Sequence, residues 1–160
     1  MKKDYVSRIS ISLSAISQNE SVARSLVAVA AASLDPTASE LADVRCAVSE
    51  AVTNAIIHGY KNGGGARIGK EAPLVYITVT LYSDSILVEV KDKGVGIADI
   101  KKAREPLFTT DETGERSGMG FAVMEAFMDE VRVLSTPGKG TRVILRKTIG
   151  KAEDREALAE

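Results

Sequence analysis

The apolar residues of this chain are spaced with two different periods. Residues 8–13 alternate apolar and polar side chains, which predicts a strand with one buried face. Residues 17–34 and 37–58 repeat apolar side chains every three to four positions, which predicts two helices, each opening with the Ser/Thr-x-x-Glu spacing of a capping box. The second half is predicted to form strands over 74–82, 86–92, 131–135 and 141–145, and helices over 98–104 and 116–128.

Each of the first two predicted helices should have a buried face. The inner stripe of the first should consist of Val22, Leu26, Val29 and Ala30. Glu20 and Arg24 should then fall on the opposite side, which makes Arg24 a candidate exposed contact for a partner protein. The second helix should end at Gly59, in the left-handed conformation that glycine favours at helix C-termini. Cys46, within that helix, should be a small buried residue.

The order of the predicted elements indicates a fold class. The strands lie mainly in the second half and pair as hairpins, without the βαβ alternation of a Rossmann domain. We therefore expect an α+β fold, a two-layer α/β sandwich with a mixed, mostly antiparallel sheet and helices on one face. A single domain should span residues 1–150, with a flexible tail over 151–160. The glycine-rich segment 61–73 lacks the Gly-Lys-Ser/Thr ending of a P-loop and is interpreted as a mobile connector.

The composition is that of an ordinary globular protein. The chain has 160 residues, of which 44% are hydrophobic and 27% charged, with a formal net charge of −1. A charge balance this close to neutral provides no electrostatic attraction for nucleic acid. The single cysteine excludes an intramolecular disulfide and suits a reducing compartment. The sequence shows neither a long apolar run nor a signal-peptide core, so we expect a cytoplasmic protein without a membrane span.

Glu50 and Asn54 are the first candidate functional pair. Four residues of α-helix turn through about 400°, so these side chains should lie one turn apart on the same face. The residues around them are mostly apolar, and polar side chains on a mostly buried helix need partners or a cavity. An Asn carbonyl can supply one oxygen ligand to Mg²⁺, and a nearby Glu can act as general base toward an attacking hydroxyl. The alternative is that both side chains simply face solvent.

Two glycine pairs mark further candidates. Asp92 follows a predicted strand, where its carboxylate can accept a hydrogen bond from an exocyclic amine of adenine. Gly94 and Gly96 leave room for a flat base beside the backbone, although Asp and Gly are also ordinary turn formers. A second pair, Gly118 and Gly120, opens a predicted helix whose free N–H groups suit phosphate oxygens. Arg116, just before this pair, can meet charge developing on a terminal phosphate, unless it is simply a solvated surface residue.

These motifs occur in a fixed order: Glu50-x-x-x-Asn54, Asp92-x-Gly94-x-Gly96, and Gly118-x-Gly120, with a polar segment of lid length between the last two. The order resembles the N, G1 and G2 boxes of the GHKL (Bergerat-fold) ATPase superfamily. Residues 49–60, 106–110 and 115–121 resemble more closely the sporulation anti-sigma F factors within that superfamily. The likeness runs from about Ile9 to Lys147.

That resemblance implies a function and a set of roles. The family consists of dimeric serine kinases that sequester a sporulation sigma factor and phosphorylate an anti-anti-sigma protein of the STAS type. The implied ligands are ATP and Mg²⁺, with Glu50 as catalytic base, Asn54 as metal ligand, Asp92 as adenine acceptor and Arg116 at the γ-phosphate. The other implied nucleotide-binding positions are Gly94, Gly96, Thr109, Thr110, Ser117, Gly118, Met119, Gly120 and Thr141. Residues 109–117 would form the lid.

Other functions of the same fold remain open at this point. One is a nucleotide-switched module that binds a sigma factor without transferring phosphate. Another is a general stress anti-sigma kinase of the same superfamily. A GHKL ATPase of a DNA-repair or chaperone machine is less favoured, because such proteins carry further domains after the ATPase.

Overall fold

The computed structural model describes residues 5–61, 73–107 and 118–150. Within these ranges a five-stranded sheet has the order β1-β2-β3-β5-β4. Every neighbouring pair is antiparallel, in line with the mostly antiparallel sheet that the sequence predicted. Both predicted hairpins are confirmed. The strands are β1 (Ser7–Ser14), β2 (Leu74–Leu81), β3 (Ser85–Lys91), β4 (Glu130–Thr136) and β5 (Gly140–Thr148).

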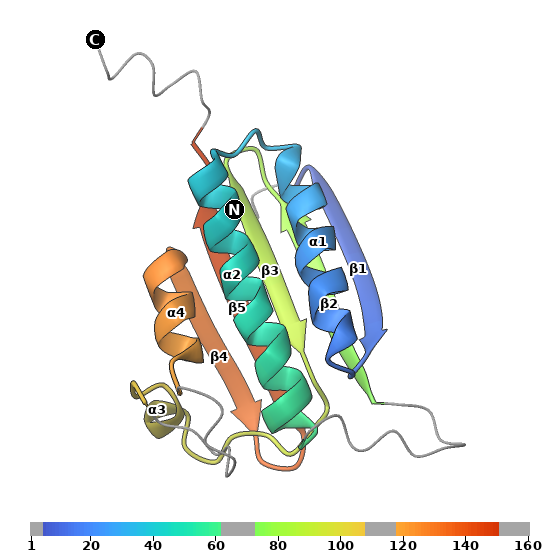
Figure 1. Ribbon diagram of the computed structural model, residues 1–160, viewed down its shortest axis with the longest axis vertical. Coiled ribbons are helices and arrows are strands. Elements are labelled where there is room, and N and C mark those ends of the chain that lie inside the picture. Colours follow the sequence, from blue (N-terminus) through green and yellow to red (C-terminus); the bar gives the residue numbers. More distant parts are fainter. Residues whose placement is uncertain (1–4, 62–72, 108–117, 151–160) are drawn as a thin grey trace.

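The helices form a second layer on one face of this sheet (Figure 1). They are α1 (Gln18–Ala32), α2 (Ala38–Asn54) and α4 (Gly120–Phe127), while the single-turn α3 (Ile100–Ala103) lies beside the lower end of α4. The apolar core lies between the two layers and includes Val48 and Val52 of α2 opposite Ile77 and Val88 of the sheet. The predicted α+β two-layer sandwich is therefore confirmed.

The buried face of α1 differs from the prediction. Val22 and Val29 are 47% and 76% exposed, and the buried residues are Ala23, Val27, Ala30 and Ala31. The helix is thus rotated by about one residue, or 100°, from the expected stripe. Small alanine side chains let α1 approach α2 closely, which outweighs the burial of two valines. As a result, Glu20 and Arg24 lie toward α2, and Arg24 is half-buried instead of exposed.

Only one of the two predicted capping boxes forms. At the start of α2, Thr37 Oγ1 accepts from the Glu40 N–H and the Glu40 carboxylate accepts from the Thr37 N–H. At the start of α1, Ser17 has helical backbone angles and makes no capping hydrogen bond. The Glu20 carboxylate instead accepts from Ser49 Oγ of α2 at 2.5 Å. Tertiary contact between the helices has replaced the local motif.

The end of α2 also differs from the prediction. The helix continues beyond Asn54 as a π-helical turn over Ala55–Gly59, and Gly59 has no left-handed backbone angle. Lys61, with φ of 48°, takes the left-handed conformation instead. Glycine is required at position 59 for another reason, because a Cβ there would lie 2.8 Å from Cγ of Asp92. Cys46 of α2 is exposed, not buried as expected, because it lies off the helix face that meets the sheet.

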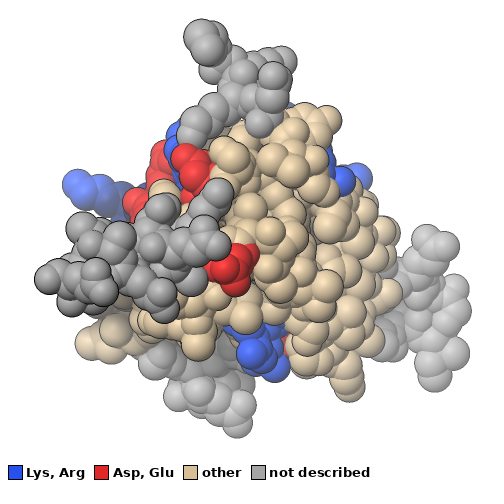
Figure 2. Space-filling view, turned by 90° about the horizontal axis from the view of Figure 1, so that it is seen from above, with Lys and Arg blue, Asp and Glu red and all other residues tan. Residues whose placement is uncertain are grey.

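The surface agrees with the neutral composition. Figure 2 shows the upper end of the molecule, where neutral residues cover most of the visible described surface and Lys and Arg lie toward its margins. Among the described residues, no helix combines the length and apolar character needed to cross a lipid bilayer.

Candidate functional site

Four segments meet at the lower end of the helical layer in Figure 1. They are the C-terminal end of α2, the loop after β3, the start of α4 and the turn between β4 and β5. Antiparallel pairing explains this meeting, since the last residues of β3 lie opposite the first residues of β5, at the same end of the strands. The three motifs singled out in the sequence lie on these segments.

Glu50 and Asn54 approach the same point on α4. A Cβ placed on Gly120 would lie 3.1 Å from Glu50 Oε2, 3.3 Å from Asn54 Oδ1 and 3.3 Å from Asn54 Nδ2. Both residues are half-buried. The predicted shared face is thus confirmed, and α4 begins directly against it. Glycine at position 120 leaves these polar atoms accessible from the α4 side.

The start of α4 has features of an anion site. Its N-cap residue, Met119, makes no side-chain capping hydrogen bond, and the preceding Gly118 has φ of 68°. The first-turn N–H groups of a helix have no partner within the helix, and the helix dipole places partial positive charge there. These N–H groups lie near Glu50 and Asn54, since a Cβ on Gly120 would lie 3.1 Å from Glu50 Oε2 and 3.3 Å from Asn54 Oδ1. The arrangement suits phosphate oxygens.

Asp92 is buried at the adjacent edge of the sheet, with 4% of its surface exposed. Its Oδ1 accepts from the Gly94 N–H at 2.9 Å and from the Thr141 N–H at 3.3 Å. Within the described residues no donor contacts Oδ2, so that atom can accept from a ligand. Burial raises the pKa of the Asp92 carboxyl, and the two N–H donors offset part of this rise.

Glycines surround this carboxylate because the backbones approach too closely for side chains. A Cβ on Gly94 would lie 1.9 Å from the Gly59 carbonyl oxygen, and one on Gly140 would lie 2.1 Å from the Asp92 carbonyl oxygen. Gly96 has φ of 72°, and its Cβ would lie 2.2 Å from the Thr136 carbonyl oxygen. The Val95 N–H donates to the Gly59 carbonyl at 2.9 Å, which joins this loop to the end of α2.

Two positioning residues of the site were missed by the sequence analysis. Ser135 Oγ accepts from the Ile97 N–H at 2.8 Å and lies 2.8 Å from Thr141 Oγ1. The Tyr60 hydroxyl donates to the Leu74 carbonyl at 2.7 Å and accepts from the Lys93 N–H at 2.7 Å. Strand register places Ser135 directly opposite Thr141, so pairing the predicted hairpin residue by residue could have found it. Tyr60 ends the 49–60 motif, but that motif does not indicate what its hydroxyl contacts.

The remaining predicted residues divide into two groups. Thr109, Thr110, Arg116 and Ser117, with the predicted lid over 109–117, lie outside the described residues, as do most of the glycine-rich connector and the tail. Arg24 is described: its Nη1 lies 3.7 Å from Glu20 Oε1, and within the described part of the chain its buried Nε has no hydrogen-bond partner. It thus lies near Ser49, the residue before Glu50, because Ser49 bonds the same carboxylate oxygen.

The oxygen atoms at this site fit a magnesium ion whose other ligands are phosphate and water oxygens. Among the described residues, no group of three or more His, Cys, Asp and Glu side chains could hold a metal ion. Mg²⁺ commonly takes only one or two protein oxygens, and Asn54 Oδ1 supplies one without adding negative charge beside a polyphosphate. The space above Gly120, which a side chain would fill, leaves that oxygen accessible.

Replacing Asp92 with Asn should stabilise the protein while weakening nucleotide binding. The raised pKa of Asp92 means that the folded protein favours the neutral carboxyl. The charged carboxylate therefore lowers the free energy of unfolding of the wild type at pH 7, and this loss disappears as the pH falls through the raised pKa. Urea unfolding without nucleotide should show Asp92→Asn more stable than wild type by about 1 kcal/mol at pH 7. This difference should be nearly gone at about pH 4. A variant less stable than wild type at pH 7 would contradict this.

Comparison with known proteins agrees with the fold and the motifs. Residues 13–147 match the family described as "Histidine kinase-like ATPase domain", which implies a domain that binds ATP. A solved structure of the RsbU and RsbW domains of Rv1364c from Mycobacterium tuberculosis superimposes on 90% of this chain with a TM-score of 0.61, and the match covers 33% of that chain. At 21% identity this second likeness concerns the fold alone.

Curated relatives are much more similar in sequence. The anti-sigma F factor of Thermoanaerobacter sp. (strain X514) is 52% identical over 147 residues, which cover 92% of this chain and 97% of the relative. The anti-sigma F factor of Bacillus licheniformis is 49% identical, over 91% of this chain and 94% of the relative. That of Clostridium acetobutylicum is 51% identical, over 86% and 91%. The chain therefore belongs to the histidine kinase-like ATPase domain family and, within it, to the anti-sigma F factors.

Proposed function

We propose that this protein is an anti-sigma factor that sequesters a sporulation sigma factor and, as an ATP-dependent serine kinase, phosphorylates a STAS-type anti-anti-sigma protein. The observation that supports it most is the meeting of Glu50, Asn54 and Gly120 beside the uncapped start of α4. A metal ligand, a base and a phosphate cradle are the parts that phosphoryl transfer requires. The sequence relatives, named anti-sigma F factors, support the sigma-binding half of the proposal.

In this proposal the adenine lies at Asp92, where Oδ2 accepts from the exocyclic amine. Gly94 and Gly96 are proposed to line the base pocket through their backbone, because the Gly59 and Thr136 carbonyls occupy their Cβ positions. Thr141 lies beside the same carboxylate. The triphosphate then runs toward the N–H groups of residues 118–120, with Asn54 as the protein ligand of Mg²⁺. The ion would neutralise phosphate charge when bound.

Glu50 acts on the partner's serine. Its Oε2 lies against the first turn of α4, so it faces the place proposed for the terminal phosphate. As general base it accepts the serine hydroxyl proton while the oxygen attacks the γ-phosphate, and ADP is the leaving group. Arg116 is proposed to meet the charge that develops there, and Thr109, Thr110 and Ser117 to belong to the segment that covers the nucleotide.

Two assays test the two halves of this function. Incubation with a STAS-type partner and ³²P-labelled ATP should label a partner serine; absence of labelling would contradict the kinase assignment. Titration of a fluorescent sporulation sigma factor in the presence of ATP or of ADP should give saturable binding that depends on the nucleotide. Arg24 is the proposed partner contact, since it lies on α1 and its Glu20 neighbour bonds the residue before Glu50. No binding with either nucleotide would contradict the anti-sigma assignment.

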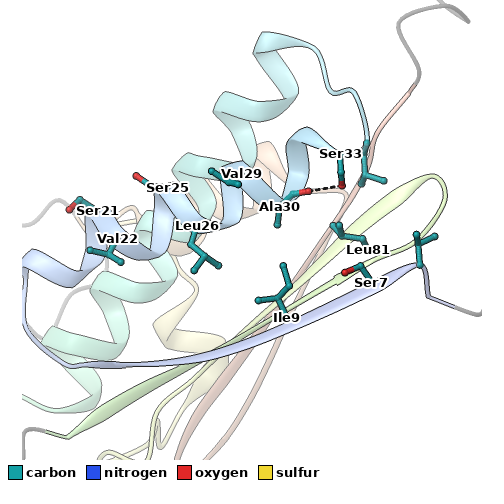
Figure 3. Close-up of a pocket in the computed structure, with 12 residues that line it drawn as sticks. Ser7, Ile9, Ser21, Val22, Ser25, Leu26, Val29, Ala30, Ser33 and Leu81 are labelled. Carbon is teal, nitrogen blue, oxygen red and sulfur yellow. Dashed lines mark hydrogen bonds between the residues drawn. The ribbon is translucent and has the colours of Figure 1, made fainter.

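We also propose a homodimer, and the groove between α1 and β1 is its candidate surface. Figure 3 shows Val22 and Leu26 of α1 above Ile9 of β1, with the groove between them. The sheet order leaves β1 at an edge, so its outer side can pair with another strand. A second copy would cover apolar side chains that α1 leaves exposed.

Replacing Val22 with Glu should therefore dissociate the dimer. Val22 is 47% exposed, so the substitution costs the monomer little, but it places a charge in the groove. Leu134→Glu is the matched control, because Leu134 is 54% exposed on β4 at the other edge of the sheet. Sedimentation equilibrium should show a monomer for Val22→Glu and a dimer for wild type and Leu134→Glu. A dimer that Val22→Glu leaves intact would place the interface elsewhere.

A further inference from the structure

Ser135 occupies a junction that the proposed mechanism does not use. It lies on β4, directly opposite Thr141 of β5, and is half-buried. Its hydroxyl makes three contacts: it accepts from the Ile97 N–H at 2.8 Å, lies 3.0 Å from the Gly140 carbonyl oxygen, and lies 2.8 Å from Thr141 Oγ1. Ile97 directly follows the Gly94–Gly96 loop, so one hydroxyl connects that loop to the strand that carries Thr141.

The number of protons at this junction decides how the two hydroxyls point. A serine hydroxyl has one proton and two acceptor positions, and the Ile97 N–H occupies one of the acceptor positions. If Ser135 gave its proton to Thr141, the buried Gly140 carbonyl would lose its Ser135 donor, which is unfavourable for a buried group. Ser135 therefore donates to Gly140, and Thr141 donates to Ser135.

Thr141 then presents only acceptor lone pairs to a ligand. Its N–H is already directed to Asp92 Oδ1, and Asp92 Oδ2 is an acceptor as well. Acceptors on both Thr141 and Asp92 suit the exocyclic amine of adenine, reached directly or through a water molecule. They oppose guanine, which carries a carbonyl oxygen at the same ring position. A hydroxyl free to rotate would not discriminate in this way, because it could donate to that carbonyl.

We propose that Ser135 is a positioning residue for nucleobase specificity, which fixes the Thr141 hydroxyl as an acceptor and thereby favours ATP over GTP. This inference rests on the proposed function, since it takes the base to lie at Asp92. It assigns a task to a residue that does not itself touch the nucleotide.

The test is calorimetric titration of ATP and of GTP, each with Mg²⁺, into wild type, Ser135→Ala, Ser135→Thr and Thr141→Val. Wild type should prefer ATP. Ser135→Ala should narrow the ratio of the two dissociation constants by roughly ten-fold, with GTP gaining as ATP loses, and Ser135→Thr should restore the ratio. If Ser135→Ala leaves the ratio of the two dissociation constants unchanged, the proposal is overturned. This includes the case in which the variant binds ATP and GTP more weakly by the same factor, which would show a structural role only.

Thr141→Val keeps the test decisive if Ser135→Ala fails to fold, because it leaves the bond between Ser135 and Ile97 in place. It should narrow the ratio through weaker ATP binding alone, because valine can neither accept from adenine nor donate to guanine. Adding Ser135→Ala to Thr141→Val should change the ratio no further. If Thr141→Val still prefers ATP over GTP as strongly as wild type, the inference is overturned. If wild type binds ATP and the variants keep the wild-type preference for ATP over GTP, only this inference fails. If wild type binds neither nucleotide, the proposed function fails as well.

Discussion

Glu50→Gln should reduce phosphate transfer to a STAS-type partner by about 10²–10⁴-fold, the usual contribution of a positioned general base. The amide keeps the size of the side chain, and Gln still fits beside Gly120. It cannot accept the serine proton, however. ATP affinity should change little, because the base contributes to transfer and not to holding the nucleotide. Single-turnover transfer of ³²P, together with an ATP titration, separates the two effects.

Two further variants make this result specific. Glu89→Gln is the matched control, since Glu89 lies on β3 and pairs with Arg142 instead of facing the site; transfer should remain at the wild-type level. Asn54→Ala should have the complementary effect and weaken Mg²⁺-dependent ATP binding itself. If Glu50→Gln transferred phosphate as fast as wild type, Glu50 would not be the base. The protein could then be a nucleotide-switched binding module.

Gly94→Ala should destabilise the fold by at least about 3 kcal/mol. The added Cβ would lie 1.9 Å from the Gly59 carbonyl oxygen, so the loop after β3 must separate from the end of α2. That separation breaks the bond from the Val95 N–H to Gly59. Denaturant unfolding without nucleotide measures the loss, and ATP affinity should fall with it because Asp92 lies between the same segments.

Gly138→Ala distinguishes close approach from backbone conformation. Gly138 has φ of 75° but open space around its Cβ position, whereas Gly94 has no left-handed angle and no space. Gly138→Ala should therefore lower the free energy of unfolding only by the cost of placing alanine in the left-handed conformation, about 1–2 kcal/mol. If both variants lost the same stability, the contact between Gly94 and Gly59 would not be what requires glycine.

The sheet and the site motifs were predictable because they follow local rules. Alternating residues set the strands, and the helical spacing of Glu50 and Asn54 placed both on one face. The orientation of α1 was not predictable in this way. Val22 and Val29 are more apolar than Ala23 and Ala31, but close packing against α2 favours the smaller residues. Hydrophobicity alone cannot show which of the two apolar faces of α1 packs closely against α2.

The site shows a similar limit. The glycines were singled out for reasons that differ from those in the structure. A Cβ on Gly59 would meet Asp92, more than thirty residues away in the sequence, and Cβ atoms on Gly94 and Gly96 would meet the Gly59 and Thr136 carbonyls, where the sequence suggested room for a base. Ser135 and Tyr60 act through contacts between segments distant in sequence. Ser135 belongs to no motif, and the 49–60 motif, which Tyr60 ends, does not indicate what its hydroxyl contacts. Such residues become visible only when strand register and loop ends are known.

The most direct test of the proposed site is a crystal structure of the protein with Mg²⁺ and a non-hydrolysable ATP analogue. The adenine amine should lie within hydrogen-bond distance of Asp92 Oδ2, the phosphates at the N–H groups of residues 118–120, and the metal on Asn54 Oδ1. An analogue bound elsewhere, with Glu50 and Asn54 remote from its phosphates, would contradict the assignment of this site.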